Sequence, residues 1–258
     1  MEPETFGEPA QEETVRARNF IARLGGVYSS PWEAFTEIGS APRLVIPIIA
    51  ILIVSAFGGW YVMQKIDTRA VMQAAMEQAV RQGRMTEEQM NQQMAMSAAA
   101  AGPVTAVGAG VYVVIICLAV AGYGKLFSMI AGAENSYKSL FEVSIYAMLA
   151  VSVVSTILTV IILQIKGQGR ITDIDSIVAS SLGSWIEIAA GADVLPKFIM
   201  RLAIAVDIFN IWTIALLSIG FSAVSKKLKT SVAAIWLGGA YIIFSIINAA
   251  AASVIGGR

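Results

Sequence analysis

Histidine is absent from this 258-residue chain, and cysteine occurs once, as Cys117. The lack of histidine excludes Ser-His-Asp and Cys-His nucleophilic sites and histidine metal sites. A single cysteine excludes an intrachain disulfide, and its place inside an apolar run is typical of a small packed hydrophobe. No G-x-S-x-G, Walker A or S-x-x-K motif is present. We therefore predict no catalytic residues, no bound cofactor and no metal, and we expect that the protein is not an enzyme.

Charged residues are scarce, at 14% of the chain, and their formal net charge is zero. A soluble domain carries about a quarter charged residues. Hydrophobic residues make up 57% of this chain, and the mean hydropathy is +0.71. This surplus of apolar side chains indicates a protein that faces lipid. The balanced charge argues against nucleic acid as a partner, because nucleic-acid-binding proteins are usually basic.

Apolar segments of spanning length recur along the chain. A helix needs about 20 apolar residues to cross the hydrocarbon core of a bilayer. Five segments fit this length: 44–64, 104–127, 143–165, 198–224 and 231–255. The sequence therefore predicts an all-α polytopic membrane protein, a five-helix transmembrane bundle over 44–255. Residues 1–13 read as a disordered acidic tail, and 14–43 as interfacial amphipathic helices.

The region before the first span carries two helix patterns. In 14–28, apolar residues such as Phe20 and Leu24 fall near one face, and Arg16, Arg18 and Arg23 are available to phosphates. A helix among lipid headgroups and a helix packed under the bundle both fit this pattern. Next, Ser30-Pro31-Trp32-Glu33 is a helix start with a cap, a proline and a capping box. We predict a short surface helix there, with Ser30, Pro31, Trp32 and Phe35 at the interface.

Two long loops also carry helix signals. In 65–102, Met72, Met76 and Val80 recur every four residues, and Thr86-Glu87-Glu88-Gln89 forms a capping box. This pattern predicts two helices with a turn between them. In 166–197, a start signal over Thr172-Asp173-Ile174-Asp175 predicts a further helix that includes Leu182.

Basic residues set the expected orientation. Lys226, Lys227 and Lys229 form a cluster between the last two spans, and four arginines precede the first span. Five spans place both groups on one side, which the positive-inside rule assigns to the cytoplasm. We therefore expect a cytoplasmic N-terminus and a C-terminus outside.

One acidic residue, Asp207, lies well inside a predicted span. A charged aspartate at mid-membrane costs roughly 2.5–3.5 kcal/mol on insertion scales. Asn210 shares its helix face, Trp212 follows, and Asn248 and Lys125 are candidate partners. This candidate intramembrane polar site has two interpretations, a substrate or proton site and a structural polar clamp between helices.

Four fragments carry a family resemblance. They are Ser30-Pro31-Trp32-Glu33-Ala34-Phe35, Ala131-Gly132-Ala133-Glu134-Asn135-Ser136-Tyr137-Lys138 with Ile145-Tyr146-Ala147, Asp207-Ile208-Phe209-Asn210-Ile211-Trp212, and Ile219-Gly220-Phe221 with the basic turn. Because of the order and spacing of these fragments, the chain resembles the Yip family, the Ypt/Rab-interacting five-span membrane proteins. The resemblance is greater to the prokaryotic branch of that family. Met148-Leu149-Ala150 stands where the family often has proline, and the 65–102 loop is longer than in eukaryotic members.

The resemblance implies five helices with a cytosolic N-terminus, here in the plasma (inner) membrane of a prokaryote. It implies Rab-type GTPase partners only for a eukaryotic member. We therefore expect a scaffold, adaptor or membrane organiser that contacts membrane lipids and binds a protein partner or itself. The alternative is a small transporter or channel that uses Asp207.

Overall fold

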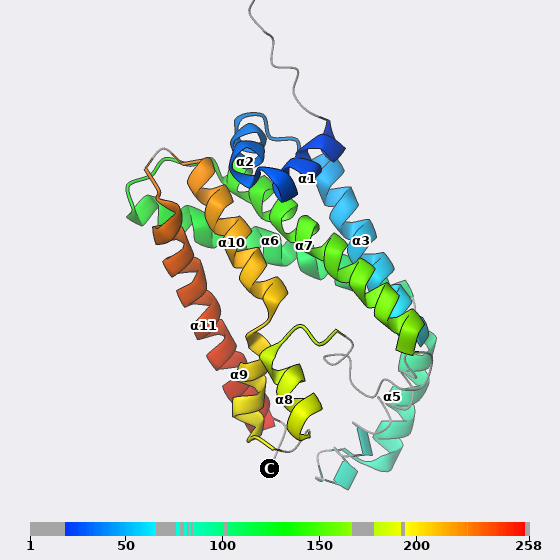
Figure 1. Cartoon of the computed structure of the whole chain (residues 1–258). Coiled ribbons are helices and arrows are strands. Elements are labelled where there is room, and N and C mark those ends of the chain that lie inside the picture. The colour runs from blue at the N-terminus through cyan, green and yellow to red at the C-terminus, as the bar shows by residue number, and fades with distance from the viewer. Residues whose placement is uncertain are drawn as a thin grey trace, which may run out of the picture.

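A computed structural model describes residues 19–65, 76–77, 80–81, 83, 85–100, 103–166, 178–191, 194–225 and 227–255. Over these residues the fold is all-helical, as predicted, and Figure 1 shows the helices as one elongated bundle. The helices are α1 (Phe20–Ser29), α2 (Pro31–Ser40), α3 (Val45–Lys65), α5 (Glu87–Ala100), α6 (Pro103–Ile130), α7 (Tyr137–Lys166), α8 (Leu182–Ala190), α9 (Lys197–Ala205), α10 (Ile208–Ala223) and α11 (Thr230–Ile255).

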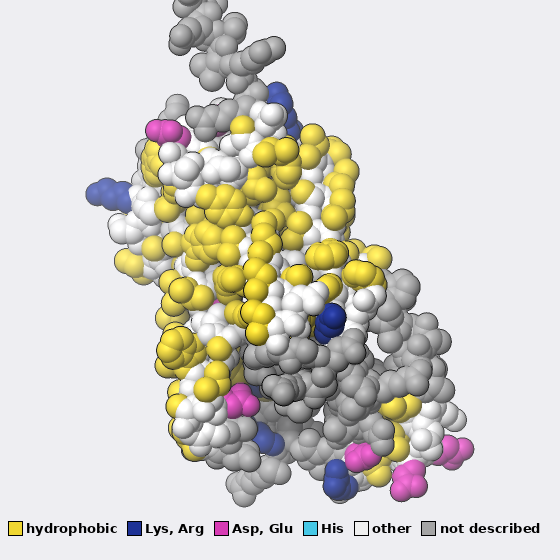
Figure 2. Space-filling model, turned by 45° about the vertical axis from the view of Figure 1, so that its right-hand side comes forward, with side chains coloured by type: hydrophobic (Ala, Val, Ile, Leu, Met, Phe, Trp, Pro, Cys, Tyr) yellow, Lys and Arg dark blue, Asp and Glu magenta, His cyan; other side chains and the backbone are white. Residues whose placement is uncertain are grey.

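Four of these helices are long and apolar enough to cross a membrane. They are α3, α6, α7 and α11, and they overlap the predicted spans 44–64, 104–127, 143–165 and 231–255, although α7 begins earlier than predicted, at Tyr137. On the face drawn in Figure 2, hydrophobic side chains cover the middle of the described part, while most charged side chains lie toward its two ends. This distribution fits a hydrocarbon layer around the middle of the bundle.

The structure differs from the prediction at the fourth span, 198–224. Instead of one helix it has two, α9 and α10, separated by Val206 and Asp207. Ile208–Ala223 is apolar but shorter than the four spanning helices. The predicted count of five continuous spans is therefore not reproduced, although both short helices pack along α11. The Tyr241 hydroxyl of α11 donates to the Ala205 carbonyl at 2.8 Å, directly at the break.

The helices of the bundle form two groups. One contains α3, α6 and α7, the other contains α9, α10 and α11, and contact between α7 and α10 joins them. Gly220 permits this contact, because a Cβ there would lie 2.3 Å from Val143 Cγ1 and 3.2 Å from the Phe35 ring. Small residues allow close packing of helices in lipid, where no hydrophobic force drives the helices together.

The helices α1 and α2, here called the N-terminal platform, lie across one end of the bundle (Figure 1). Val27, Phe35 and Ile38 of the platform are fully or almost fully buried, whereas Trp32 is 51% exposed. Phe35 therefore belongs to the core, while Trp32 is at the surface. Of the two interpretations of 14–28, the described part favours a helix packed against the bundle, because Arg23 is only 1% exposed. Arg16 and Arg18 lie outside the described residues.

The helix start signals have mixed outcomes. Pro31 is the first residue of α2 as predicted, but the Ser30 side chain makes no capping hydrogen bond. At α5, in contrast, the Thr86 and Gln89 side chains each accept from the other's backbone N–H, at 3.2 and 3.0 Å, which confirms that capping box. Most of the helix predicted before it, including Met72, lies outside the described residues, as do residues 1–13 and the Thr172 to Asp175 signal.

Candidate functional site

Asp207 lies at the break between α9 and α10 and caps the start of α10. It has extended backbone dihedrals and is the N-cap of α10. Its Oδ1 accepts from the backbone N–H groups of Phe209 at 2.7 Å and Asn210 at 3.2 Å. The first N–H groups of a helix have no partner inside the helix, and a carboxylate there also meets the positive end of the helix dipole. The Asp207 carboxylate therefore accepts hydrogen bonds from the otherwise unpaired N–H groups at the start of α10, a helix that begins within the bundle.

A second segment supports the same break. The Ser180 hydroxyl donates to Asp207 Oδ2, and Ser181 forms an isolated antiparallel bridge with Asp207. In this bridge the Leu182 N–H donates to the Val206 carbonyl at 2.8 Å, and the Ile208 N–H donates to the Ser180 carbonyl at 3.1 Å. Backbone groups freed by a helix break in lipid must find partners within the protein. The segment before α8 provides those partners.

The structure does not bring the other predicted polar residues to Asp207. Asn248 is exposed on α11, and its Nδ2 donates to the Phe244 carbonyl of its own helix at 2.8 Å. Lys125 Nζ donates to the Asn135 carbonyl at 2.7 Å. Trp212 instead packs on Tyr28 of the platform, with ring centroids 6.1 Å apart. The predicted residues therefore do not form one polar site. Asp207 is an N-cap, Asn210 lies next to it, and the other three make separate structural contacts.

A buried charge cluster, missed from the sequence, fixes the platform to the bundle. Arg23 is 1% exposed and Glu142 of α7 is fully buried. Arg23 Nη1 lies 3.6 Å from Glu142 Oε1 and donates to the Ala41 carbonyl at 3.0 Å. Arg23 Nε lies 3.4 Å from Glu37 Oε1. The cluster thus joins α1, α2 and α7 through one guanidinium group.

Glu142 has a further partner that strengthens this attachment. Its Oε2 accepts from the backbone N–H of Arg43, in the link between α2 and α3, at 2.6 Å. Ser139, one turn earlier, donates its hydroxyl to the Gly39 carbonyl at 3.0 Å. The sequence analysis assigned no role to Glu142, which directly precedes the predicted span 143–165, and it interpreted Arg23 only as a cation available to phosphates. The pairing of two residues so far apart in sequence depends on the tertiary fold.

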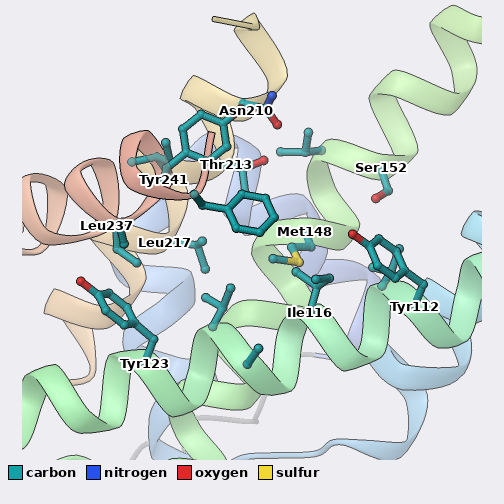
Figure 3. Close-up of a pocket in the computed structure, with 17 residues that line it drawn as sticks. Tyr112, Ile116, Tyr123, Met148, Ser152, Asn210, Thr213, Leu217, Leu237 and Tyr241 are labelled. Carbon is teal, nitrogen blue, oxygen red and sulfur yellow. The ribbon is translucent and has the colours of Figure 1, made fainter. Parts of the chain in front are cut away.

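A cavity of about 590 Å³ lies among α6, α7, α10 and α11. Its walls are mostly apolar, with a few polar groups among them. Figure 3 shows the Tyr112 hydroxyl directed into the cavity on the same side as Ser152, with Asn210 and Thr213 across from them. The residues that line it are Tyr112, Val113, Ile116, Ala119, Val120, Tyr123, Met148, Val151, Ser152, Asn210, Thr213, Ile214, Leu217, Leu237, Ala240, Tyr241 and Phe244.

These features define an all-helical integral membrane protein with a broken helix and an apolar cavity between its helices. Among the described residues, no group of three or more acidic or cysteine side chains is arranged to hold a metal ion. Residues 25–250 match the Yip1 domain, and the chain therefore belongs to the Yip1 domain family. Comparison with curated proteins and with solved structures finds no match.

Proposed function

We propose that this protein is a non-enzymatic membrane scaffold or organiser whose N-terminal platform presents a rigid surface at one end of the bundle. The observation that carries this proposal is the buried charge cluster of Arg23, Glu37 and Glu142. Burying charges is costly, and in some proteins a buried pair contributes a unique arrangement of elements rather than net stability. Here it fixes two short helices that precede the first span.

The surface of the platform supports the same function. Its underside is buried against α7 and α10, while Trp32 and Ile21 are 51% and 76% exposed. Exposed tryptophan, tyrosine and aliphatic side chains suit both the membrane interface and a protein partner. Because the platform is held by the charge cluster, these side chains keep fixed positions relative to the bundle. Fixed presentation of a recognition surface is what a scaffold or adaptor requires.

Site-specific photo-crosslinking tests this proposal. A photoreactive amino acid in place of Trp32 should give a discrete protein adduct in native membranes. The control is the same amino acid at Ile243, which is 61% exposed on the spanning helix α11 and should give lipid adducts. The result that contradicts the proposal is a pattern at Trp32 that is the same as at Ile243, without a protein adduct.

A small transporter or channel is the second candidate, and Asn210 is the observation that favours it. Asn210 lines the cavity and lies three residues from Asp207, whose carboxylate caps the same helix. A carried proton or ion would need the Asp207 charge, whereas a cap needs only a side-chain oxygen. Asp207→Asn in proteoliposomes separates the two roles, because asparagine caps a helix about as well as aspartate. Flux that stops in an Asp207→Asn variant that is still folded supports transport, and absence of flux from the parent protein removes this candidate.

A further inference from the structure

The cavity opens sideways, between two spanning helices. The helices α6 and α11 meet at one end, where the Phe127 and Trp236 ring centroids lie 4.6 Å apart and the Tyr123 hydroxyl donates to the Trp236 carbonyl at 3.1 Å. Away from this contact neither helix packs extensively on the other within the described residues. At the open side, Tyr112 is 61% exposed and Phe244 is 58% exposed. The cavity is therefore accessible from the surroundings of the bundle.

Those surroundings are hydrocarbon. The residues that line the cavity lie in the middle portions of the spanning helices α6, α7 and α11 and in the apolar helix α10. From Tyr112 to Tyr123 the wall extends about 16 Å along α6, at about 1.5 Å per residue, within a hydrocarbon layer of about 30 Å. The molecules that can enter from the side are thus molecules dissolved in the membrane interior.

Three polar side chains on the walls have no hydrogen-bond partner within the described part of the chain. Thr213 and Tyr241 already donate, to the Phe209 and Ala205 carbonyls, both at 2.8 Å. The Tyr112 and Ser152 hydroxyls and the Asn210 amide make no such bond. Polar groups left unsatisfied in hydrocarbon cost several kcal/mol each. A pure hydrocarbon chain leaves them unsatisfied, whereas a ligand with oxygen acceptors does not.

The described walls also carry no charged side chain. Apolar walls with a small number of polar groups are typical of sites for small organic ligands. The absence of a countercharge excludes an ionised headgroup from this part of the cavity. The chemistry that matches is a neutral molecule with a long hydrocarbon part and one or more carbonyl or ester oxygens.

We propose that the cavity between α6 and α11 binds a neutral membrane lipid, with its hydrocarbon part between the two helices and its oxygen atoms on Asn210, Ser152 and Tyr112. This chemistry has two sources in a membrane, an isoprenoid quinone and an acylglycerol. The binding site is independent of the partner surface proposed for the N-terminal platform, which lies at the end of the bundle. Failure of one proposal therefore leaves the other standing.

The test combines a cavity-filling variant with a matched control. Ala240 lines the cavity, whereas Ala215 of α10 is exposed and does not line it. We expect the purified parent protein and Ala215→Phe to retain a neutral lipid in about equal amounts, measured by mass spectrometry of the extract. Ala240→Phe should retain at least about tenfold less, because the added ring occupies the space of the ligand.

A second variant tests the polar contact without filling the cavity. Asn210→Leu keeps the size of the side chain and removes its donor, so retention of the neutral lipid should fall about three- to tenfold, in line with one lost hydrogen bond. Delipidated protein reloaded in phosphatidylcholine nanodiscs with either a quinone or a diacylglycerol identifies the source. Equal retention by the Ala240→Phe and Ala215→Phe variants, unchanged retention by Asn210→Leu, or retention of phospholipid alone would each overturn the proposal.

Discussion

At the scale of single residues, Asp207 is used as a helix cap, and this use predicts how substitutions behave. Asp207→Ala removes the acceptor of two backbone N–H groups and leaves the Ser180 hydroxyl without its partner. We expect a loss of about 0.5–2 kcal/mol, the usual cost of deleting an N-cap. Asp207→Asn should lose only a small part of this, because the amide oxygen still accepts.

The single cysteine provides the measurement for this prediction. Cys117 is fully buried, so its reaction with a thiol-reactive dye reports unfolding in detergent. Melting temperatures should fall in the order parent, Asp207→Asn and Asp207→Ala, with the larger step at alanine. Equal melting temperatures for all three proteins would show that the cap does not stabilise the break.

The charge cluster gives a second prediction at this scale. Arg23→Met leaves the buried Glu142 carboxylate without its cation, and breaking a buried pair in this way costs about 3–5 kcal/mol. Adding Glu142→Gln should recover part of the loss, because glutamine carries no charge and can still accept from the Arg43 N–H. A double-mutant cycle of unfolding free energies measures this coupling. If the two losses simply add, the pair is not coupled and the platform is held by its other contacts, such as the hydrogen bond from Ser139 to the Gly39 carbonyl.

At the scale of elements, the contact between α7 and α10 depends on Gly220. An alanine Cβ there would collide with the buried side chain of Val143, 2.3 Å away, and crowd Phe35 of the platform. We expect Gly220→Ala to destabilise the protein by about 1–3 kcal/mol, the usual range for overpacking, as measured by thermal unfolding.

The control for Gly220 lies on another spanning helix. Apart from the backbone of α11 itself, no heavy atom of the described residues lies within 4 Å of a Cβ added at Gly238 in α11. Gly238→Ala should therefore leave stability unchanged or raise it by up to about 1 kcal/mol, because alanine favours a helix more than glycine does. Similar losses at both glycines would mean that close helix contact is not the reason for the effect at Gly220.

At the scale of the whole molecule, the fold favours one arrangement in the membrane. A Cβ at Gly39 in α2 would lie 2.3 Å from Val224 Cγ1, so the platform and the end of α10 lie at the same end of the bundle. Figure 1 shows α5 and α8 near the other end. Lys227 and Lys229 follow Val224 closely in the chain, which agrees with the expected placement of both basic groups on one side. We propose that this side is cytoplasmic.

Single-cysteine labelling checks the arrangement. In a Cys117→Ser background, Lys227→Cys should react with a membrane-impermeant maleimide only from the cytoplasmic side. Glu88→Cys in α5 and Ala190→Cys in α8, both exposed, should react only from the opposite side. Reaction of Lys227→Cys and Glu88→Cys from one side would contradict the proposed topology.

The sequence by itself determined the parts that depend on local composition. Runs of apolar residues bounded by charges located the four spanning helices, because the cost of polar groups in hydrocarbon leaves few alternatives. The largest boundary error is at α7, which begins at Tyr137 and not at 143. The capping box at Thr86 was likewise predictable, since its partners lie three residues apart. The absence of histidine is also a property of the sequence alone, and it limits the chemistry that is available to the protein.

Only the tertiary structure decided the features that join distant segments. The apolar run over 198–224 was predicted to be one span. The break at Asp207 is stable because Ser180 and Ser181, from another segment, provide hydrogen-bond partners for the Asp207 side chain and for the backbone around it. An aspartate before an apolar run is also an N-cap signal, so part of this arrangement was readable. Nothing local pairs Arg23 with Glu142, or sets α6 and α11 apart to form the cavity. Those arrangements follow from how the helices pack, and packing brings together residues that the sequence keeps far apart.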